Sequence, residues 1–241
     1  MSVFFEIHQG LPREGPGSAA SARRALSLAK PHLPERPSVV EAGCGPGGSL
    51  PTIASELPGA RITAFDLHAP FVEQARALGV PGTELLVADM TTWRPTSPVD
   101  LVWCEGAAYF LGVPAALARF HDWLRPGGVL VFSEAVWLVP PADRPERAVR
   151  FWREYPAMDD IAHTRALVDA AGFARVGDFV LPADDWRAYY RPQRDRIAAL
   201  RPRYAGDAEA LAELDAHDEE IAVFDTCGHA YSYLLTVATR R

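Results

Sequence analysis

The chain has 241 residues, 49% of them apolar and 23% charged, which is typical of a globular protein long enough for one α/β domain with a full core. Its formal net charge of −7 argues against a nucleic-acid partner, because such a partner requires a basic surface. No apolar stretch reaches the roughly 20 residues needed to span a bilayer and no signal peptide is evident, so we expect a cytoplasmic protein without a membrane partner.

The amino-terminal residues predict an irregular arm followed by a helix. Residues 1–17 contain three glycines and two prolines, which favours an arm rather than a strand. Ser18 is a typical N-cap for a helix over residues 19–30. His8 lies on the arm and could act as a general base, because a neutral imidazole is available near pH 7. A solvated loop histidine is the interpretation that we prefer.

A glycine-rich turn is the most informative segment of the chain. Residues 41–47 read Glu-Ala-Gly-Cys-Gly-Pro-Gly and directly follow an apolar strand. Glycine tolerates positive φ and lets the backbone approach a ligand without a Cβ in the way. Turns of this kind, between a strand and a helix, bind nucleotide-like ligands in open α/β sheets. Alone the signal is weak, because glycine-rich turns also close loops that bind nothing.

Four further strands are expected between this turn and the middle of the chain. Each run is short, bounded by turn residues and almost wholly apolar, as in parallel strands buried on both faces. These runs are 61–66, 84–88, 99–104 and 129–134. Apolar residues at i, i+3 and i+4 predict intervening helices over 70–78 and 114–124.

Acidic residues stand where three of these strands end. Asp66 lies about 20 residues beyond the glycine turn, the spacing expected of a carboxylate that binds both hydroxyls of a ribose. Asp89 and Glu105 follow the next two runs. The alternatives are local: Asp66 could N-cap the next helix, Asp89 could close a turn, and Glu105 could bond nearby backbone.

The carboxyl-terminal part predicts two strands separated by a long helical insertion. Short helices are expected over 147–155 and 160–171, and strands over 174–181 and 231–239. The insertion contains an arginine-rich helix over 184–204 and an acidic helix over 207–224. A basic helix alone would suggest nucleic acid or a membrane. We expect these two helices instead to pair as an antiparallel hairpin of complementary charge, or to form an oligomer contact such as a homodimer.

Taken together, these motifs resemble the class I S-adenosylmethionine-dependent methyltransferases. The resemblance rests on the glycine turn, Asp66, the pair Asp89-Met90, and Leu-Arg-Pro-Gly-Gly at 124–128. The matching motifs lie within residues 36–182, and the order of the expected strands and helices agrees over the whole chain. Residues 7–18 and 103–109 are also similar to those of a bacterial subgroup of small-molecule methyltransferases.

The resemblance implies a Rossmann-like three-layer α/β sandwich. Its seven-stranded sheet would be mostly parallel, with the last strand antiparallel and a helical insertion before that strand. The whole chain would form a single methyltransferase domain. Its parts would be an arm and helix at 1–35, a cofactor-binding core at 36–182, the helical insertion at 183–228 and the final strand at 229–241.

The resemblance also implies S-adenosylmethionine as cofactor, S-adenosylhomocysteine as product and a small-molecule acceptor. Asp66 would bind the ribose, Asp89 the adenine amino group, and Glu105 would lie near the transferable methyl. The remaining cofactor-binding candidates are Glu41, Gly43, Cys44 and Gly45 for the methionine part, and Leu67 and Met90 for the adenine. Met90 could equally be ordinary core.

A general base is needed only if the acceptor keeps its proton until it attacks. The catalytic candidates are His8, Glu105, Tyr109 and His229, and Tyr109 and Trp137 could form an aromatic wall near the cationic sulfonium. The three cysteines have neither a disulfide pattern nor metal-ligand spacing, so no metal is expected.

Two other functions compete with methyl transfer. One is a non-catalytic protein that binds S-adenosylmethionine and uses the helical hairpin as a partner surface. The other is an NAD-dependent oxidoreductase, because a glycine turn followed by an acid also suits a nicotinamide cofactor. The pair Asp89-Met90, the closing antiparallel strand and the lack of a G-x-G-x-x-G spacing argue against the second.

Overall fold

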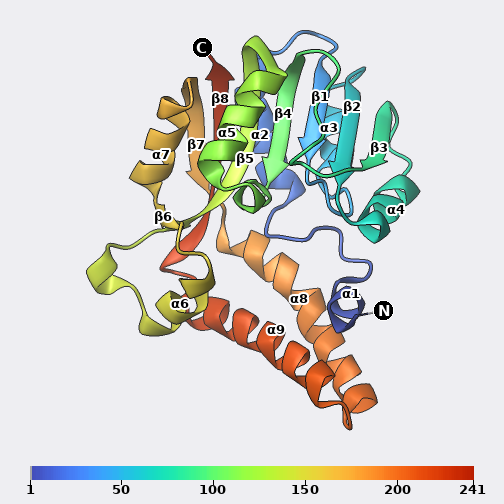
Figure 1. Cartoon of the computed structure of the whole chain (residues 1–241), viewed down its shortest axis with the longest axis vertical. Coiled ribbons are helices and arrows are strands. Elements are labelled where there is room, and N and C mark those ends of the chain that lie inside the picture. Colours follow the sequence, from blue (N-terminus) through green and yellow to red (C-terminus); the bar gives the residue numbers. More distant parts are fainter. Residues whose placement is uncertain (1) are drawn as a thin grey trace.

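A twisted sheet of eight strands organises the computed structural model, which describes residues 2–241 (Figure 1). The strands are β1 (Ser38–Ala42), β2 (Arg61–Asp66), β3 (Thr83–Val87), β4 (Val99–Glu105), β5 (Leu124–Trp137), β6 (Asp159–Asp160), β7 (Phe173–Val180) and β8 (Tyr231–Arg240). The order is β3-β2-β1-β4-β5-β8-β7, and the two-residue β6 pairs with the end of β5. β8 is antiparallel to both β5 and β7, whereas β1 to β5 are parallel. The predicted sheet is therefore confirmed, with β6 as a small addition.

Nine α-helices accompany the sheet within the described residues. They are α1 (Val3–His8), α2 (Ala19–Ala29), α3 (Leu50–Glu56), α4 (Ala69–Ala77), α5 (Val113–Trp123), α6 (Glu146–Phe151), α7 (Ile161–Ala170), α8 (Ala183–Leu200) and α9 (Ala208–Cys227). The expected N-cap of α2 is present, because Ser18 Oγ accepts a hydrogen bond from the Ser21 N–H. Asp160 and Asp207 cap α7 and α9 in the same way. Among residues 2–241, no helix is both long and apolar enough to cross a membrane.

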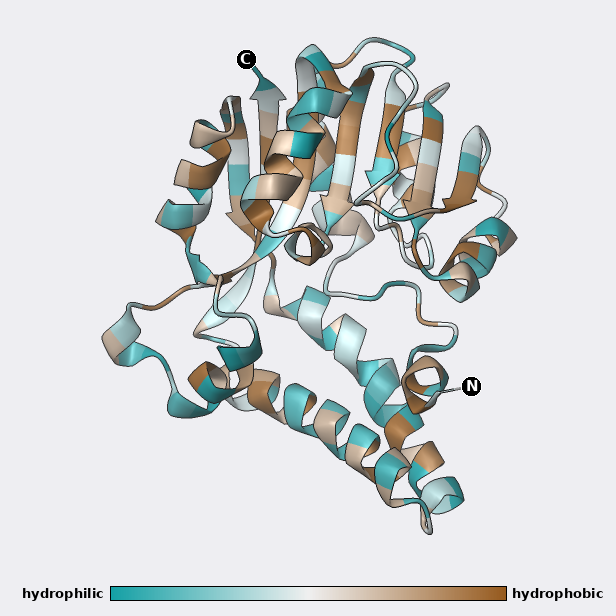
Figure 2. Cartoon of the chain, in the orientation of Figure 1, coloured by the Kyte–Doolittle hydropathy of each residue, from teal (hydrophilic) through white to brown (hydrophobic). Residues whose placement is uncertain are grey.

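Apolar side chains on both faces of the central strands explain the three layers. On one face, Leu26 of α2 and Ile53 of α3 belong to one buried cluster with the strands. On the other face, Phe120 of α5 and Val168 of α7 pack in a second cluster with the sheet. Figure 2 shows the strands largely in the colours of hydrophobic residues. Because β1 to β5 are parallel, their carboxyl ends lie along one edge of this covered sheet.

A third apolar cluster attaches the helical insertion beneath that edge. Trp186 of α8 is buried, and its ring stacks on Phe224 of α9 with 5.3 Å between centroids. The Trp186 Nε1–H donates to Ser232 Oγ of β8 at 2.9 Å. Tyr231 packs edge-on against the same indole ring. Figure 1 shows α8 and α9 opposite the carboxyl ends of the parallel strands.

Complementary charges join α8 to α9, as the sequence predicts. Arg194 of α8 lies 2.9 Å from Asp225 of α9. Arg201, just beyond α8, bonds both Asp215 and Asp218 of α9. Earlier residues of one helix pair with later residues of the other, so the two form an antiparallel hairpin.

The arm differs from the expectation of an irregular segment, because it begins with the short helix α1. Ile7 is fully buried in the cluster formed with the helical insertion. Phe5 lies against Phe71 of α4, with 5.6 Å between ring centroids. These long-range contacts stabilise a six-residue helix that would be marginal by itself.

We expect Trp186→Ala to destabilise the protein by about 3–5 kcal/mol, because it removes a buried indole and leaves Ser232 without its donor. Urea unfolding measures this difference, with Val149→Ala on the exposed side of α6 as the control, expected within about 0.5 kcal/mol of wild type. A Trp186→Ala loss as small as that of the control would show that α8 is not anchored to β8 in this way.

Candidate functional site

The glycine turn lies at the carboxyl end of β1 and is fixed to the end of β2. The N–H groups of Gly43 and Cys44 both donate to the Phe65 carbonyl at 2.9 Å. Gly43 has a φ of +69°, and a Cβ there would lie 2.6 Å from the Ala107 Cβ. Only glycine therefore lets this turn approach the segment that follows β4.

Two backbone donors orient the carboxylate of Asp66. Its Oδ2 accepts from the Gly45 N–H and its Oδ1 from the His68 N–H, both at 2.9 Å. The N-cap of α4 is His68 rather than Asp66, so the helix-capping alternative is wrong. Beside it, Leu67 is 60% exposed, which leaves an apolar side chain uncovered at the edge where an adenine is expected.

Asp89 closes a turn after β3, which was the local alternative for this residue. Its Oδ1 accepts from the Thr91 N–H at 2.7 Å, and its carbonyl accepts from the Trp93 N–H at 2.8 Å. The hydrogen bond from Thr91 is the largest cause that holds the pKa of Asp89 below its ordinary value. Met90 is buried, and its Cε would lie 3.4 Å from a Cβ on Gly43, so its side chain lines the glycine turn.

Two acidic side chains face the same turn from β1 and β4. Glu41 is 3% exposed, and among residues 2–241 its Oε2 has no hydrogen-bond partner. Burial raises the pKa of Glu41 to about 8, with Glu105 adding to the effect and Arg13 opposing it. Glu105 Oε2 accepts from Arg13 Nη1 and from Ser49 Oγ, so the alternative that it bonds only local backbone is wrong. Such carboxylates suit a cationic ligand.

The arm crosses directly over the glycine turn. Arg13 Nη2 donates to the Gly48 carbonyl at 3.1 Å and Nη1 donates to Ser49 Oγ at 3.0 Å. A Cβ on Gly48 would lie 2.3 Å from the Pro12 carbonyl oxygen. Gln74 of α4 holds the Leu11 carbonyl at 2.6 Å. The arm therefore covers the turn on which the methionine part of the cofactor is expected.

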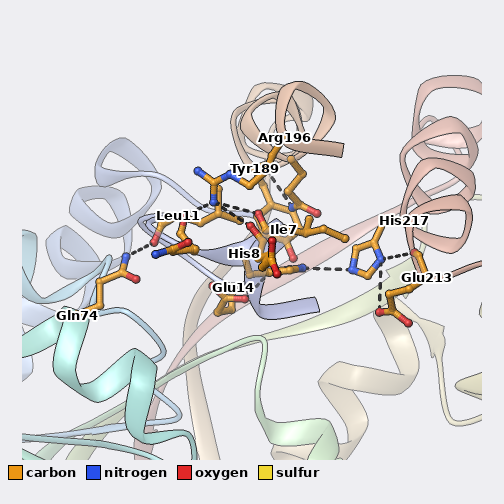
Figure 3. Close-up of polar contacts among 12 residues, drawn as sticks. Ile7, His8, Leu11, Glu14, Gln74, Tyr189, Arg196, Glu213 and His217 are labelled. Carbon is orange, nitrogen blue, oxygen red and sulfur yellow. Dashed lines mark hydrogen bonds and ion pairs between the residues drawn. The ribbon is translucent and has the colours of Figure 1, made fainter. Parts of the chain in front are cut away.

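His8 is buried at the base of this arm (Figure 3). Its Nδ1 lies 2.5 Å from Glu14 Oε2 and its Nε2 lies 3.3 Å from His217 Nε2. His217 Nδ1 faces the Glu213 carbonyl at 2.9 Å, and a carbonyl only accepts, so Nδ1 carries the proton. The interpretation of His8 as a solvated loop residue is wrong. With both ring nitrogens engaged, His8 joins the arm to α9 and is not a free base.

The other catalytic candidates lie in different surroundings. Tyr109 follows β4 in a short 3-10 turn (Ala108–Phe110) and is 41% exposed. Burial of its hydroxyl raises the pKa of Tyr109 to about 12, so it is a hydrogen-bond donor rather than a base at neutral pH. His229 is exposed between α9 and β8, and it forms no hydrogen bond with another candidate among the described residues.

The cysteines Cys44 and Cys104 lie at the ends of the neighbouring strands β1 and β4, and both are buried. Burial raises the pKa of both thiols above the ordinary value. They remain protonated and act as small apolar side chains of the core.

Sequence reasoning missed Glu134 and Tyr233. Glu134 is 6% exposed near the end of β5, and its Oε1 accepts from the Tyr155 hydroxyl at 2.9 Å. Burial raises the pKa of Glu134 to about 7. Tyr233 of β8 reaches the end of β4, where a Cβ on Gly106 would lie 3.2 Å from its ring. The sequence feature that could have revealed Glu134 is an acidic residue near the end of an otherwise apolar strand.

The chain has clear relatives of known family. Residues 39–128 match the model of a methyltransferase domain. The chain is 30% identical over 210 residues to a trans-aconitate 2-methyltransferase of Azoarcus sp. (strain BH72), covering 82% of this chain and 80% of that protein. It is 31% identical to a trans-aconitate 2-methyltransferase of Paracidovorax citrulli (strain AAC00-1), covering 72% and 68% of the two chains.

Solved structures share the fold over essentially the full length. An S-adenosylmethionine-dependent methyltransferase from Thiobacillus denitrificans, in complex with S-adenosylhomocysteine, superposes with a TM-score of 0.83 at 21% identity and covers 100% of both chains. A Geobacter sulfurreducens counterpart with the same ligand has a TM-score of 0.80 at 20% identity, covering 99% of this chain and 98% of the other. The NAD-dependent alternative has no support in these comparisons. The chain belongs to the class I S-adenosylmethionine-dependent methyltransferases, and it transfers a methyl group from S-adenosylmethionine to a small molecule.

Proposed function

We propose that the cofactor lies along the carboxyl ends of β1, β2, β3 and β4. In this proposal Asp66 binds the ribose hydroxyls and Leu67 covers one face of the adenine. Asp89 accepts from the adenine amino group, and Met90 contributes a backbone amide and an apolar contact. The glycine turn and Glu41 hold the methionine part.

One observation carries this assignment: the Asp66 carboxylate is held in place by two backbone N–H groups, one of them from the glycine turn itself. A carboxylate fixed this way keeps further lone pairs for a ribose diol and loses little side-chain entropy on binding. The Oε2 of Glu41, which has no partner among residues 2–241, fits the same ligand, because a buried carboxylate gains most from a nearby cation.

S-adenosylmethionine, when bound, supplies a methyl carbon that is activated by attachment to a cationic sulfur. Glu41 and Glu105 stabilise positive charge at the end of β1 and β4. The arm excludes water by covering the glycine turn. Tyr109 donates a hydrogen bond toward the acceptor. Most of the catalysis is then the positioning of acceptor against methyl.

The acceptor enters, in our proposal, between the carboxyl edge of the sheet and the layer formed by α6, α8 and α9. The relatives are named for methylation of trans-aconitate, and the acceptor here is, in our proposal, likewise a small organic molecule. We further propose that residues 1–241 act as one functional unit in the cytoplasm and that the α8–α9 hairpin is available for a homodimer contact.

We expect Asp66→Ala to weaken S-adenosylmethionine binding by about 10- to 100-fold, because two charge-assisted hydrogen bonds to the ribose are lost. Asp66→Asn should lose less, since it keeps one acceptor oxygen. Calorimetric titration measures the affinity of both variants. Glu73→Ala, which removes an exposed acid from α4, is the charge-matched control and should bind as tightly as wild type. Undiminished binding by Asp66→Ala would remove the ribose role from this residue.

Glu41 should make stability depend on pH. Its pKa is about 8 in the folded protein against an ordinary value of 4.5, so between these values the folded state binds one proton more than the unfolded state. The free energy of unfolding therefore falls as pH rises through this window. At pH 8 we expect Glu41→Gln to be more stable than wild type by about 2–4 kcal/mol, as measured by urea unfolding.

The same variant should bind S-adenosylmethionine more weakly, because it lacks the carboxylate that a cation stabilises. Wild-type affinity should rise with pH toward about 8, and Glu41→Gln should lose this slope. The exposed Glu73→Gln is the control for both measurements. The account is contradicted if Glu41→Gln shows the same pH dependence as wild type in both measurements. That result would mean that Glu41 has an ordinary pKa and no role in cofactor binding.

A further inference from the structure

The polar groups on the acceptor side of the site come from four separate elements. Glu134 lies near the end of β5, and Tyr155 donates its hydroxyl to it from the segment after α6. The ring of Tyr109 lies 5.8 Å from that of Tyr155. Tyr233 reaches from β8 to Gly106, the residue that directly follows Glu105. The acceptor side is therefore built from one carboxylate and three phenols.

Glu134 is buried and retains an oxygen for a ligand. The residue is 6% exposed, and its hydrogen bonds among residues 2–241, from the Tyr155 hydroxyl and from the Ala135 N–H, both reach Oε1. It lies one residue beyond the position in β5 that pairs with the last residue of β4. Ser133, the preceding residue, pairs with Glu105 across β4 and β5 and accepts a hydrogen bond from the Gly106 N–H.

The charges around this cluster are negative. The pKa of Tyr109 is raised first by burial and then by Glu134 and Glu220, and the same two acids act on Tyr233. Arg13 bonds Glu105, and Arg144 lies over the Trp137 ring at 4.7 Å from its centroid, with its Nε unpartnered among residues 2–241. A ligand with several carboxylates would bring negative charge beside Glu134 and find one unpartnered arginine, whereas carboxylate and aromatic faces together suit an ammonium group.

We infer that the methyl acceptor of this enzyme is a small amine, whose nitrogen is held by Glu134 among Tyr109, Tyr155 and Tyr233, and not a polycarboxylate such as trans-aconitate. This inference rests on the proposed function and names the substrate class for the same site.

The reaction balances with Glu134 as the proton acceptor. The ammonium form of the acceptor first gives its proton to Glu134 and becomes a neutral amine. The nitrogen lone pair then forms the new N–C bond while the methyl C–S bond breaks, and that bond's electron pair stays on sulfur. The products are the N-methylated ammonium ion and neutral S-adenosylhomocysteine. The pKa of Glu134, about 7, suits proton uptake near neutral pH.

The test is ligand binding to the protein saturated with S-adenosylhomocysteine. Benzylamine, tyramine, histamine and trans-aconitate are titrated calorimetrically into wild type, Glu134→Gln and Glu154→Gln. Glu154 is exposed and lies one residue before Tyr155, so its variant is a matched control for charge and location. Glu134→Gln should fold, because it removes a buried carboxyl group without changing its shape.

We expect at least one amine to bind wild type and Glu154→Gln equally, with affinity about 10- to 100-fold lower in Glu134→Gln. The amine that binds should also support S-adenosylhomocysteine formation from S-adenosylmethionine, whereas trans-aconitate should do neither. The inference is overturned if trans-aconitate binds, if none of the three amines binds, or if Glu134→Gln binds them normally. Failure of S-adenosylhomocysteine itself to bind would instead refute the proposed cofactor site.

Discussion

The structure depends on the close approach of backbone at the glycine turn after β1. A side chain at Gly43 would collide with Ala107, and one at Gly48 would collide with the Pro12 carbonyl. The first approach brings the ends of β1 and β4 together, and the second lets the arm cross the turn. Because Gly45 also donates to Asp66, the same turn orients the acid at the end of β2. One short segment therefore fixes the meeting of the strand ends and shapes the proposed cofactor site.

Buried carboxylates are the second feature of the site, and they differ in whether a cation or a hydrogen-bond donor pairs with them. Glu105 has Arg13 and Ser49 as partners, whereas one buried oxygen of Glu41 has no partner in the described part of the chain. Glu134 is supported by a phenol rather than by a cation. Buried acids without a cationic partner lower the stability of a fold, and they are retained most readily where a ligand supplies the positive charge. A sulfonium cofactor and an ammonium acceptor would supply it on the two sides of the methyl group.

Local patterns in the sequence were enough to predict the seven main strands and most of the helices. Short apolar runs mark each parallel strand, Ser18 marks the start of α2, and the opposite charges of α8 and α9 predict their pairing, as the structure confirms. The glycine turn and the spacing to Asp66 likewise pointed to the cofactor family, which the relatives establish.

Contacts between distant parts of the chain could not be predicted in this way. Arg13 and Glu105 are 92 residues apart, and His8 and His217 are 209 apart. Neither pair has a local signature, because both depend on where the arm packs after the sheet has formed. Helix α1 is stabilised by the same packing and was missed for that reason. Glu134 was passed over because it ends an apolar run that reads as ordinary core.

The most direct test of the account is a crystal structure of the protein with S-adenosylhomocysteine. The account predicts the ribose hydroxyls on Asp66, the adenine amino group on Asp89, and the amino acid end of the ligand on the glycine turn beside Glu41. The sulfur would face Glu105, on the side of Glu134 and Tyr109. A ligand bound elsewhere, or bound here without contact to Asp66 and the glycine turn, would contradict it.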